Sequence, residues 1–250
     1  MALALFPAKC PVNDLERVWI DESFELFRRQ FGDEPLRVPV ILPTREFFPP
    51  PPPATEADVR QLVRKIAGYM SVRPAVMVEF SWDRERITQL RRHIHAPLSR
   101  IGGNAGEYHR TGKHGRHIVT IDQSYFGDPV KLIAVIAHEL GHVRLLGEHK
   151  VKASRDDQES LTDLVTVYLR MGIFTSDYGT GRLWASEFRE HAADGPVRHL
   201  GYMTEPMFGY GLARYARLRG EPDPAWARHL GPRSRAHFKH AARYLSETAG

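Results

Sequence analysis

The stretch PVKLIAVIAHELGHVRLLG, residues 129–147, decides how this chain is interpreted. Asp128 precedes it as a favourable N-cap, Pro129 suits the first position of a helix, and Gly147 suits a helix end. The apolar run from Leu132 to Ala137 is almost continuous. The sequence therefore predicts one long helix here, buried on most of its surface.

Within this helix, residues 138–142 form the pattern H-E-x-x-H. Side chains four residues apart lie on one face of a helix, so His138 and His142 can bind one zinc ion at roughly 2.0–2.1 Å. Glu139 is placed to accept a proton from a zinc-bound water and pass it to a departing amine. Histidines with only a structural role on so apolar a helix would leave buried polar groups without partners, which is costly.

A catalytic zinc ion needs a third protein ligand and one open position for water. Residues 154–172 predict a second helix, in which Glu159 and Asp163 lie four residues apart on one face. We expect Glu159 to complete the metal site and Asp163 to accept a hydrogen bond from the far ring nitrogen of a ligand histidine. The alternative is a solvated acidic face, because acidic residues near a helix N-terminus also suit the helix dipole. Asp163 is too far along the helix for that explanation.

These two motifs resemble those of the gluzincin metallopeptidases, the group that includes the thermolysin-like enzymes. Their pattern is H-E-x-x-H on one helix and E-x-x-x-D on a following helix, and residues 135–168 contain both. The resemblance implies a zincin-like α+β fold, mainly helical, with a small antiparallel sheet whose edge strand borders the cleft. Residues 118–122, just before the motif helix, are the candidate for that strand. Substrate would then add its own backbone to the strand edge.

The same resemblance implies a histidine or tyrosine that stabilises the oxyanion of the transition state. His199 and Tyr202 are the catalytic candidates, and Tyr210 and His149 are further ones. Residues 201–212 also have the pattern of a close-packed helix, so their tyrosines can equally belong to the core.

Helix caps and apolar spacing predict the other elements. We expect further helices from Asn13 to Gly32, from Thr55 to Met70, and over residues 202–219 and 233–245. Strands are expected at residues 75–82 and 118–122, with a Gly-rich and His-rich connection over residues 101–117. Residues 36–42 are an edge strand at most, because Pro39 interrupts the run.

The prolines at residues 49–53 predict an extended spacer. They suggest a division into residues 1–53, an N-terminal helix and strand with the proline spacer, and residues 54–250, the zincin-like catalytic domain. A single domain over the whole chain is the alternative.

Composition limits the class of protein. The chain is 42% apolar and 26% charged, and no apolar run approaches the ~18 residues that a membrane helix needs. The single cysteine, Cys10, cannot form an internal disulfide, and the first residues lack the basic start of a secretory signal. We therefore expect a soluble, cytoplasmic protein without a membrane partner.

The net charge of +5 is modest for a nucleic-acid-binding protein. Acidic and basic residues alternate along most of the chain, and only the stretch from Arg228 to Arg243 is basic without an acidic residue. This stretch favours a solvated helix face over a nucleic-acid site. We therefore do not expect nucleic acid as a partner.

The sequence favours a zinc-dependent hydrolase, specifically a metallopeptidase that acts on a peptide or protein substrate. His138, His142 and Glu159 would bind Zn²⁺, and Glu139 would be the general base. Two alternatives stay open: a regulatory protease of the ImmA/IrrE type, which cleaves one partner, and a non-enzymatic binding protein stabilised by zinc. The sequence does not indicate the substrate or the oligomeric state.

Overall fold

The structure of the chain is a computed structural model that describes residues 8–50, 52–81, 106–111, 116–178 and 203–248. In chain order its elements are α1 (Asp14–Phe31), α2 (Glu34–Arg37), α3 (Glu56–Tyr69), β1 (Val76–Ser81), β2 (Gly106–Thr111), β3 (Arg116–Asp122), η2 (Gln123–Tyr125), α5 (Pro129–His142), η3 (Val143–Gly147), α6 (Gln158–Tyr168), α7 (Gly172–Tyr178), α9 (Glu205–Leu218), η4 (Ala225–His229) and α10 (Pro232–Glu247). The fold is α+β and mainly helical, with a small sheet.

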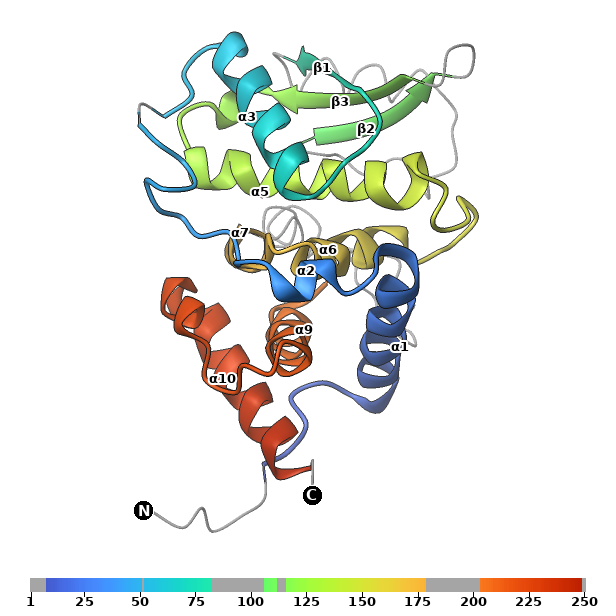
Figure 1. Cartoon of the computed structure of the whole chain (residues 1–250), viewed down its shortest axis with the longest axis vertical. Helices are drawn as coiled ribbons and strands as arrows, with labels where there is room; N and C mark the ends of the chain where they lie inside the picture. The colour runs from blue at the N-terminus through green and yellow to red at the C-terminus, as the bar shows by residue number, and fades with distance from the viewer. Residues whose placement is uncertain (1–7, 51, 82–105, 112–115, 179–202, 249–250) are drawn as a thin grey trace, which may run out of the picture.

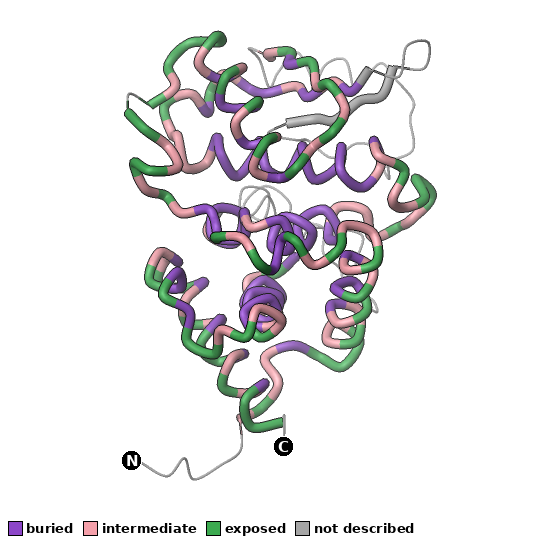
Figure 2. The backbone as a smooth tube through the Cα atoms, in the orientation of Figure 1, coloured by how far each residue is buried: buried purple, intermediate pink, exposed green. Residues whose placement is uncertain are grey.

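The elements form layers around α5 (Figure 1). The sheet and α3 pack on one side of α5, and α6 and α7 pack on the other. Beyond α6 and α7, α9 packs between α1 and α10 (Figure 1). Buried residues gather in α5, α6 and α9, which form the centre of the molecule (Figure 2).

Capping side chains fix the starts of the first long helices, as the sequence predicts. Asn13 accepts a hydrogen bond from the backbone N–H of Glu16 at 2.9 Å, and the Glu16 carboxylate accepts one from the N–H of Asn13 at 3.0 Å. Thr55 and Asp58 make the same reciprocal pair at the start of α3. Such a capping box satisfies two backbone donors that the first helical turn leaves without partners.

The predicted motif helix is confirmed as α5. Asp128 accepts a hydrogen bond from the backbone N–H of Lys131 at 3.1 Å, and Pro129 occupies the first helical position. Every residue from Leu132 to His142 is buried. After His142 the helix widens into the π-helical turn η3, which ends at Gly147 as expected.

The sheet differs from the expected antiparallel one. Its strand order is β1-β3-β2, with β3 antiparallel to β2 but parallel to β1. The expected strand at residues 118–122 is therefore the central strand, not the edge that the resemblance implied. The strand β2 lies inside the segment that the sequence indicated only as a connection. An alternating apolar pattern predicts a strand but carries no information about the direction of its neighbours.

Two further segments differ in detail from what the sequence indicates. Residues 36–42 contain the end of α2 and then an irregular segment, in which Ile41 is buried and its N–H donates to the carbonyl oxygen of Arg170 at 3.3 Å. Gly172 is the expected end of the second helix, but α6 ends at Tyr168. Gly172 is instead the first residue of α7, a helix that the sequence did not predict. Arg170, with φ of 74°, makes the turn between the two helices.

The N-terminal segment packs against the later helices. The Tyr168 hydroxyl donates to the carbonyl oxygen of Gly32 at 2.5 Å, and the Tyr215 hydroxyl donates to that of Pro35 at 3.0 Å. Ile20, Phe24 and Phe27 of α1 belong to the same hydrophobic core as α5 and α6. The division of the chain at the proline run stays a prediction.

Among the described residues, no helix has both the length and the apolar composition needed to cross a membrane.

Candidate metal centre

The two histidines of the H-E-x-x-H pattern lie on the face of α5 that packs against α6. His138 and His142 are one turn apart, and their ring centroids are 4.9 Å from each other with the ring planes nearly perpendicular. Both residues are buried. Helix geometry alone thus brings two imidazoles to one place in the core, as the spacing predicts.

Glu159, in the first turn of α6, reaches both histidines. Its Oε2 atom lies 3.1 Å from Nε2 of His138 and 3.4 Å from Nε2 of His142. The Glu159 side chain is 33% exposed, whereas that of His138 is 2% exposed. The cluster is therefore closed on the α5 side and reaches solvent beside Glu159.

Asp163 lies within hydrogen-bond distance of Nδ1, the other ring nitrogen of His138, as expected. Its Oδ1 atom lies 2.9 Å from Nδ1 of His138, and its Oδ2 accepts a hydrogen bond from the backbone N–H of Met203 at 3.0 Å. The Asp163 side chain is 1% exposed. The buried carboxylate of Asp163 on α6 thus contacts both α5 and Met203, which lies two residues before α9.

Thr162 gives His142 a corresponding partner that the sequence analysis missed. The Oγ1 atom of Thr162 lies 3.1 Å from Nδ1 of His142, and both residues are buried. The available signal was the position of Thr162, three residues after Glu159 and so on nearly the same helix face. A threonine is common in apolar helices, and its type alone does not indicate this role.

The start of α6 is fixed from the N-terminal segment, which the sequence analysis also missed. The indole N–H of Trp19 on α1 donates to Oδ2 of Asp157 at 2.7 Å, and Nε of Arg155 donates to Oδ1 at 2.7 Å. Burial alone would raise the pKa of Asp157, but the hydrogen bonds from Arg155 and Trp19 lower it. Since Glu159 follows Asp157 by two residues, these contacts orient the turn that carries Glu159.

The electrostatics of the cluster favour opposite charges on its members. Burial alone would lower the pKa of His138, but hydrogen bonds and charge attraction from Asp163 and Glu159 raise it well above its ordinary value. Burial alone would raise the pKa of Glu159, but hydrogen bonds from His138 and His142 hold it well below its ordinary value. The cluster thus combines an anionic carboxylate, Glu159, with an imidazole, His138, whose protonated form is favoured by its acidic neighbours.

The cluster could hold a metal ion, and its dimensions are compatible with zinc. The candidate ligand atoms of His138, His142 and Glu159 all lie within 4.8 Å of one another. Tetrahedral zinc with bonds of about 2.0–2.1 Å has ligand atoms roughly 3.3 Å apart. The separations of 3.1 and 3.4 Å between Glu159 and the two histidines match that edge length. Two imidazoles and one carboxylate are also a ligand set that leaves a fourth position open in catalytic zinc sites.

The other predicted catalytic residues have different outcomes. Glu139 is buried and follows His138 directly, and its role as general base stays a prediction. His199 and Tyr202 lie outside the described residues. Tyr210 belongs to the core, with its hydroxyl 3.4 Å from Oδ2 of Asp21 on α1. His149 is exposed and has a φ of 56°.

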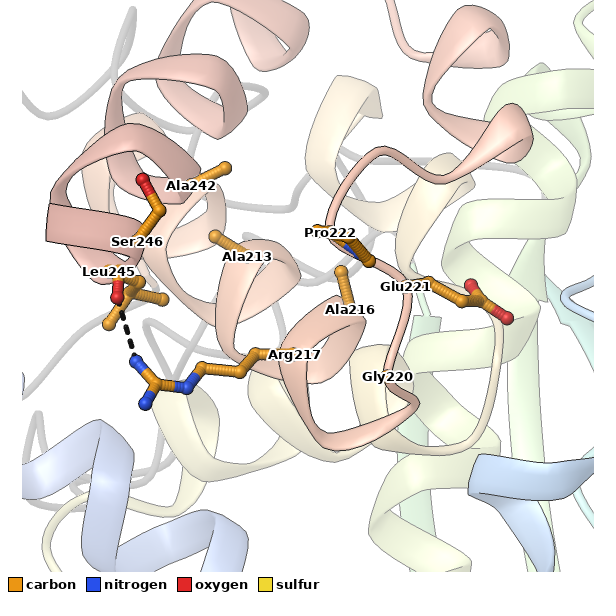
Figure 3. Close-up of a pocket in the computed structure, with 9 residues that line it drawn as sticks. All are labelled: Ala213, Ala216, Arg217, Gly220, Glu221, Pro222, Ala242, Leu245 and Ser246. Atoms are coloured by element: carbon orange, nitrogen blue, oxygen red, sulfur yellow. Dashed lines mark hydrogen bonds between the residues drawn. The ribbon is translucent and has the colours of Figure 1, made fainter. Parts of the chain in front are cut away.

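A pocket lies apart from this cluster, between α9 and α10 (Figure 3). It has a volume of about 270 Å³, and small side chains such as Ala213, Ala216 and Ala242 line it. Nη1 of Arg217 donates to the carbonyl oxygen of Leu245 at 2.8 Å beside it. None of the cluster residues lines this pocket.

The basic stretch at residues 228–243 makes many of its contacts within the chain. Nη1 of Arg233 lies 3.7 Å from Oε1 of Glu205, and Nε of Arg243 lies 2.8 Å from Oε1 of Glu247. Arg235 donates to the carbonyl oxygen of Leu230 at 2.7 Å. The two ion pairs with glutamates offset part of the charge that a nucleic-acid surface would use.

Comparison of the chain with protein-family models, curated proteins and solved structures finds no match.

Proposed function

We propose that this chain is a zinc-dependent hydrolase, specifically a metallopeptidase of the gluzincin type. The observation that carries the proposal is the convergence of His138, His142 and Glu159, with Oε2 of Glu159 within 3.4 Å of both Nε2 atoms. Asp163 and Thr162 support this arrangement as hydrogen-bond acceptors for the Nδ1 atoms of His138 and His142, because these contacts leave both Nε2 atoms directed at Glu159.

A bound zinc ion would polarise the scissile carbonyl and make an attacking water more acidic at neutral pH. His138, His142 and Glu159 would hold that ion. Glu139 would accept the proton that the attacking water loses and donate it to the leaving amine. Asp163 and Thr162 would keep the two imidazole rings in place during the reaction.

A catalytic site is favoured over a purely structural zinc site. Structural sites are usually closed by four protein ligands, whereas the described residues contribute a group of three, at a place where Glu159 is one-third exposed. A structural site also has no use for the buried acid Glu139 beside the first ligand. We propose a peptide or protein as the substrate, and a cytoplasmic location because a chain with one cysteine gains no internal disulfide from an oxidising compartment.

The test compares zinc content with hydrolysis in the wild type and in Glu139→Gln. We expect both proteins to bind one zinc ion per chain. With a mixture of peptides of diverse sequence, analysed by mass spectrometry, only the wild type should produce new cleavage products. Glu22→Gln, at an exposed position of α1, is the matched control and should behave like the wild type.

The outcomes separate the alternatives. Zinc binding with equal cleavage by wild type and Glu139→Gln would contradict the role of Glu139. Stoichiometric zinc without cleavage of any peptide in the mixture would favour a protease restricted to one partner or a non-enzymatic protein. Absence of stoichiometric zinc from both proteins would contradict the proposal itself.

A further inference from the structure

We infer that Thr162 is a positioning residue for the metal ligand His142. It would hold the ring through its hydroxyl oxygen, while its methyl group, packed against Gly141, fixes the direction of that hydroxyl. The inference rests on the proposed zinc site. It adds a residue that neither the H-E-x-x-H pattern nor the E-x-x-x-D pattern contains.

The helix packing brings Thr162 to the site. Figure 1 shows α6 running beside α5, and Thr162 is 1% exposed in their interface. A Cβ atom on Gly141 would lie 2.9 Å from Cγ2 of Thr162 and 3.3 Å from its carbonyl oxygen. Only a residue without a side chain lets α6 come this close to α5, so the glycine in the motif allows Thr162 to reach His142.

The proton on the imidazole explains why an oxygen is needed there. A neutral histidine that binds a metal through Nε2 carries its proton on Nδ1. That N–H lies in the protein core, where a donor without an acceptor destabilises the fold. The Oγ1 atom of Thr162, 3.1 Å from Nδ1, is the acceptor. The hydroxyl therefore favours the tautomer in which Nε2 is available to the metal.

The methyl group of Thr162 makes this contact directional. A helical threonine divides between two side-chain conformations, because its hydroxyl can also bond to a carbonyl oxygen of the preceding turn. The Cγ2 atom packed at Gly141 determines where the hydroxyl points, because both groups are bonded to the same Cβ. The hydroxyl oxygen is thereby held toward Nδ1 of His142.

The Nδ1 atoms of the two histidines therefore face different kinds of hydrogen-bond partner. Asp163 offers a carboxylate to His138, whereas Thr162 offers a neutral hydroxyl to His142. A charged acceptor makes a stronger hydrogen bond than a neutral one and increases the basicity of the ring. Removing the hydroxyl of Thr162 should thus reduce metal affinity without removing a charge from the site.

The test is Thr162→Val, which keeps the shape and the methyl group but removes the oxygen. We expect its zinc dissociation constant, measured by competition with a chelator, to rise roughly 10- to 100-fold. Thr162→Ser keeps the oxygen and should stay closer to the wild type than Thr162→Val does. Thr166→Val is the matched control, because Thr166 is buried one turn later and donates to the carbonyl oxygen of Asp163. Its zinc affinity should remain that of the wild type.

A second measurement does not depend on the folding of any variant. In the zinc-loaded wild type, ¹⁵N NMR should show the proton of His142 on Nδ1 and slow exchange of that proton with solvent. A proton on Nε2, with Nδ1 bound to the metal, would overturn the inference. Equal zinc affinity of Thr162→Val and the wild type would overturn it and leave the proposed function intact. A wild type that binds no zinc would overturn both.

Discussion

Gly141 and Thr162 are packed so closely that a methyl group on the glycine would lie 2.9 Å from Cγ2 of the threonine. Carbon atoms in contact prefer separations of about 3.5–4.0 Å. The helices α5 and α6 therefore meet at the glycine of the H-E-x-x-H pattern. This contact sets how far Glu159 on one helix stands from the two histidines on the other.

Gly141→Ala should therefore weaken the metal site as well as the fold. The added methyl group forces α6 away from α5, and overpacking of this kind costs about 1–3 kcal/mol in the free energy of unfolding. Zinc affinity should fall at the same time, because Glu159 and Thr162 move with α6. Chemical denaturation and zinc competition measure the two effects.

The control for this substitution is Gly68→Ala. Gly68 lies in α3, is exposed, and has no atom within 4 Å of an added Cβ. Alanine is the better helix former, so this variant should gain up to about 1 kcal/mol without a change in zinc affinity. If Gly141→Ala kept wild-type stability and affinity, the close approach of α5 and α6 would be wrong.

Trp19→Phe tests the connection between the N-terminal helix and the metal site. The variant keeps an aromatic ring but loses the hydrogen bond from the indole N–H to Asp157, which should cost about 1–3 kcal/mol of stability. Zinc affinity should also fall, because Asp157 lies at the start of the helix that carries Glu159. Leu15→Ala, at an 80% exposed position of the same helix, is the control and should change neither quantity. Unchanged zinc affinity in Trp19→Phe would show that α1 does not orient α6.

Zinc binding should release protons at pH 7. The pKa of His138 is raised above its ordinary value of 6.5, so the metal-free imidazole carries an extra proton that zinc must displace. Apparent zinc affinity should thus increase with pH through the raised pKa. Calorimetry in buffers of different ionisation enthalpy counts the protons released. A count near zero at pH 7 would contradict the raised pKa.

The raised pKa of His138 also determines how the stability of the metal-free protein changes with pH. A histidine whose pKa is raised by folding stabilises the fold fully below about pH 6.5 and loses this contribution as the pH rises through the raised value. Folding lowers the pKa of Glu159 from its ordinary value of 4.5. This carboxylate therefore stabilises the fold above about pH 4.5, and the stabilisation is lost as the pH falls through the lowered pKa. Denaturation with a chelator present should therefore show declining stability from pH 6.5 upward.

Asp163→Asn removes the charge that supports His138. The amide has one oxygen for the two donors that Asp163 now satisfies, Nδ1–H of His138 and the N–H of Met203, and it directs an NH₂ group at one of them. We expect a loss of several kcal/mol in stability, about 3–5 kcal/mol as for a broken buried ion pair, and weaker zinc binding. Calorimetry should also show fewer protons released at pH 7. A variant with wild-type proton release would show that Asp163 does not raise the pKa of His138.

The sequence predicts most of the helices and names the residues of the His138, His142 and Glu159 cluster, because helix caps and ligand-type spacing are local patterns. Capping residues fix the starts of α1 and α3, and one helical turn separates His138 from His142. The convergence of Glu159 on both histidines follows from the same spacing once α5 and α6 pack together. The helix starts and the histidine pair need no knowledge of distant parts of the chain, whereas the position of Glu159 also depends on the packing of α6 against α5.

The remaining features depend on tertiary contacts that no local pattern contains. The buried segment around Ile41 is apolar like a strand, but its backbone pairs with the turn at Arg170 and not with the sheet. The partners Thr162 and Trp19 become visible only when α6 is placed against α5 and α1. The parallel pairing of β1 with β3 is likewise a property of the chain path, which strand periodicity does not encode.

X-ray absorption at the zinc edge would show whether His138 and His142 bind the metal together. On the wild-type protein loaded with one equivalent of zinc, we expect a four-coordinate ion with two imidazole nitrogens and oxygen ligands at about 2.0–2.1 Å. In Glu159→Gln the two imidazoles should remain while the affinity falls. A zinc ion without two histidine ligands, or a wild type that does not retain the metal, would contradict the account.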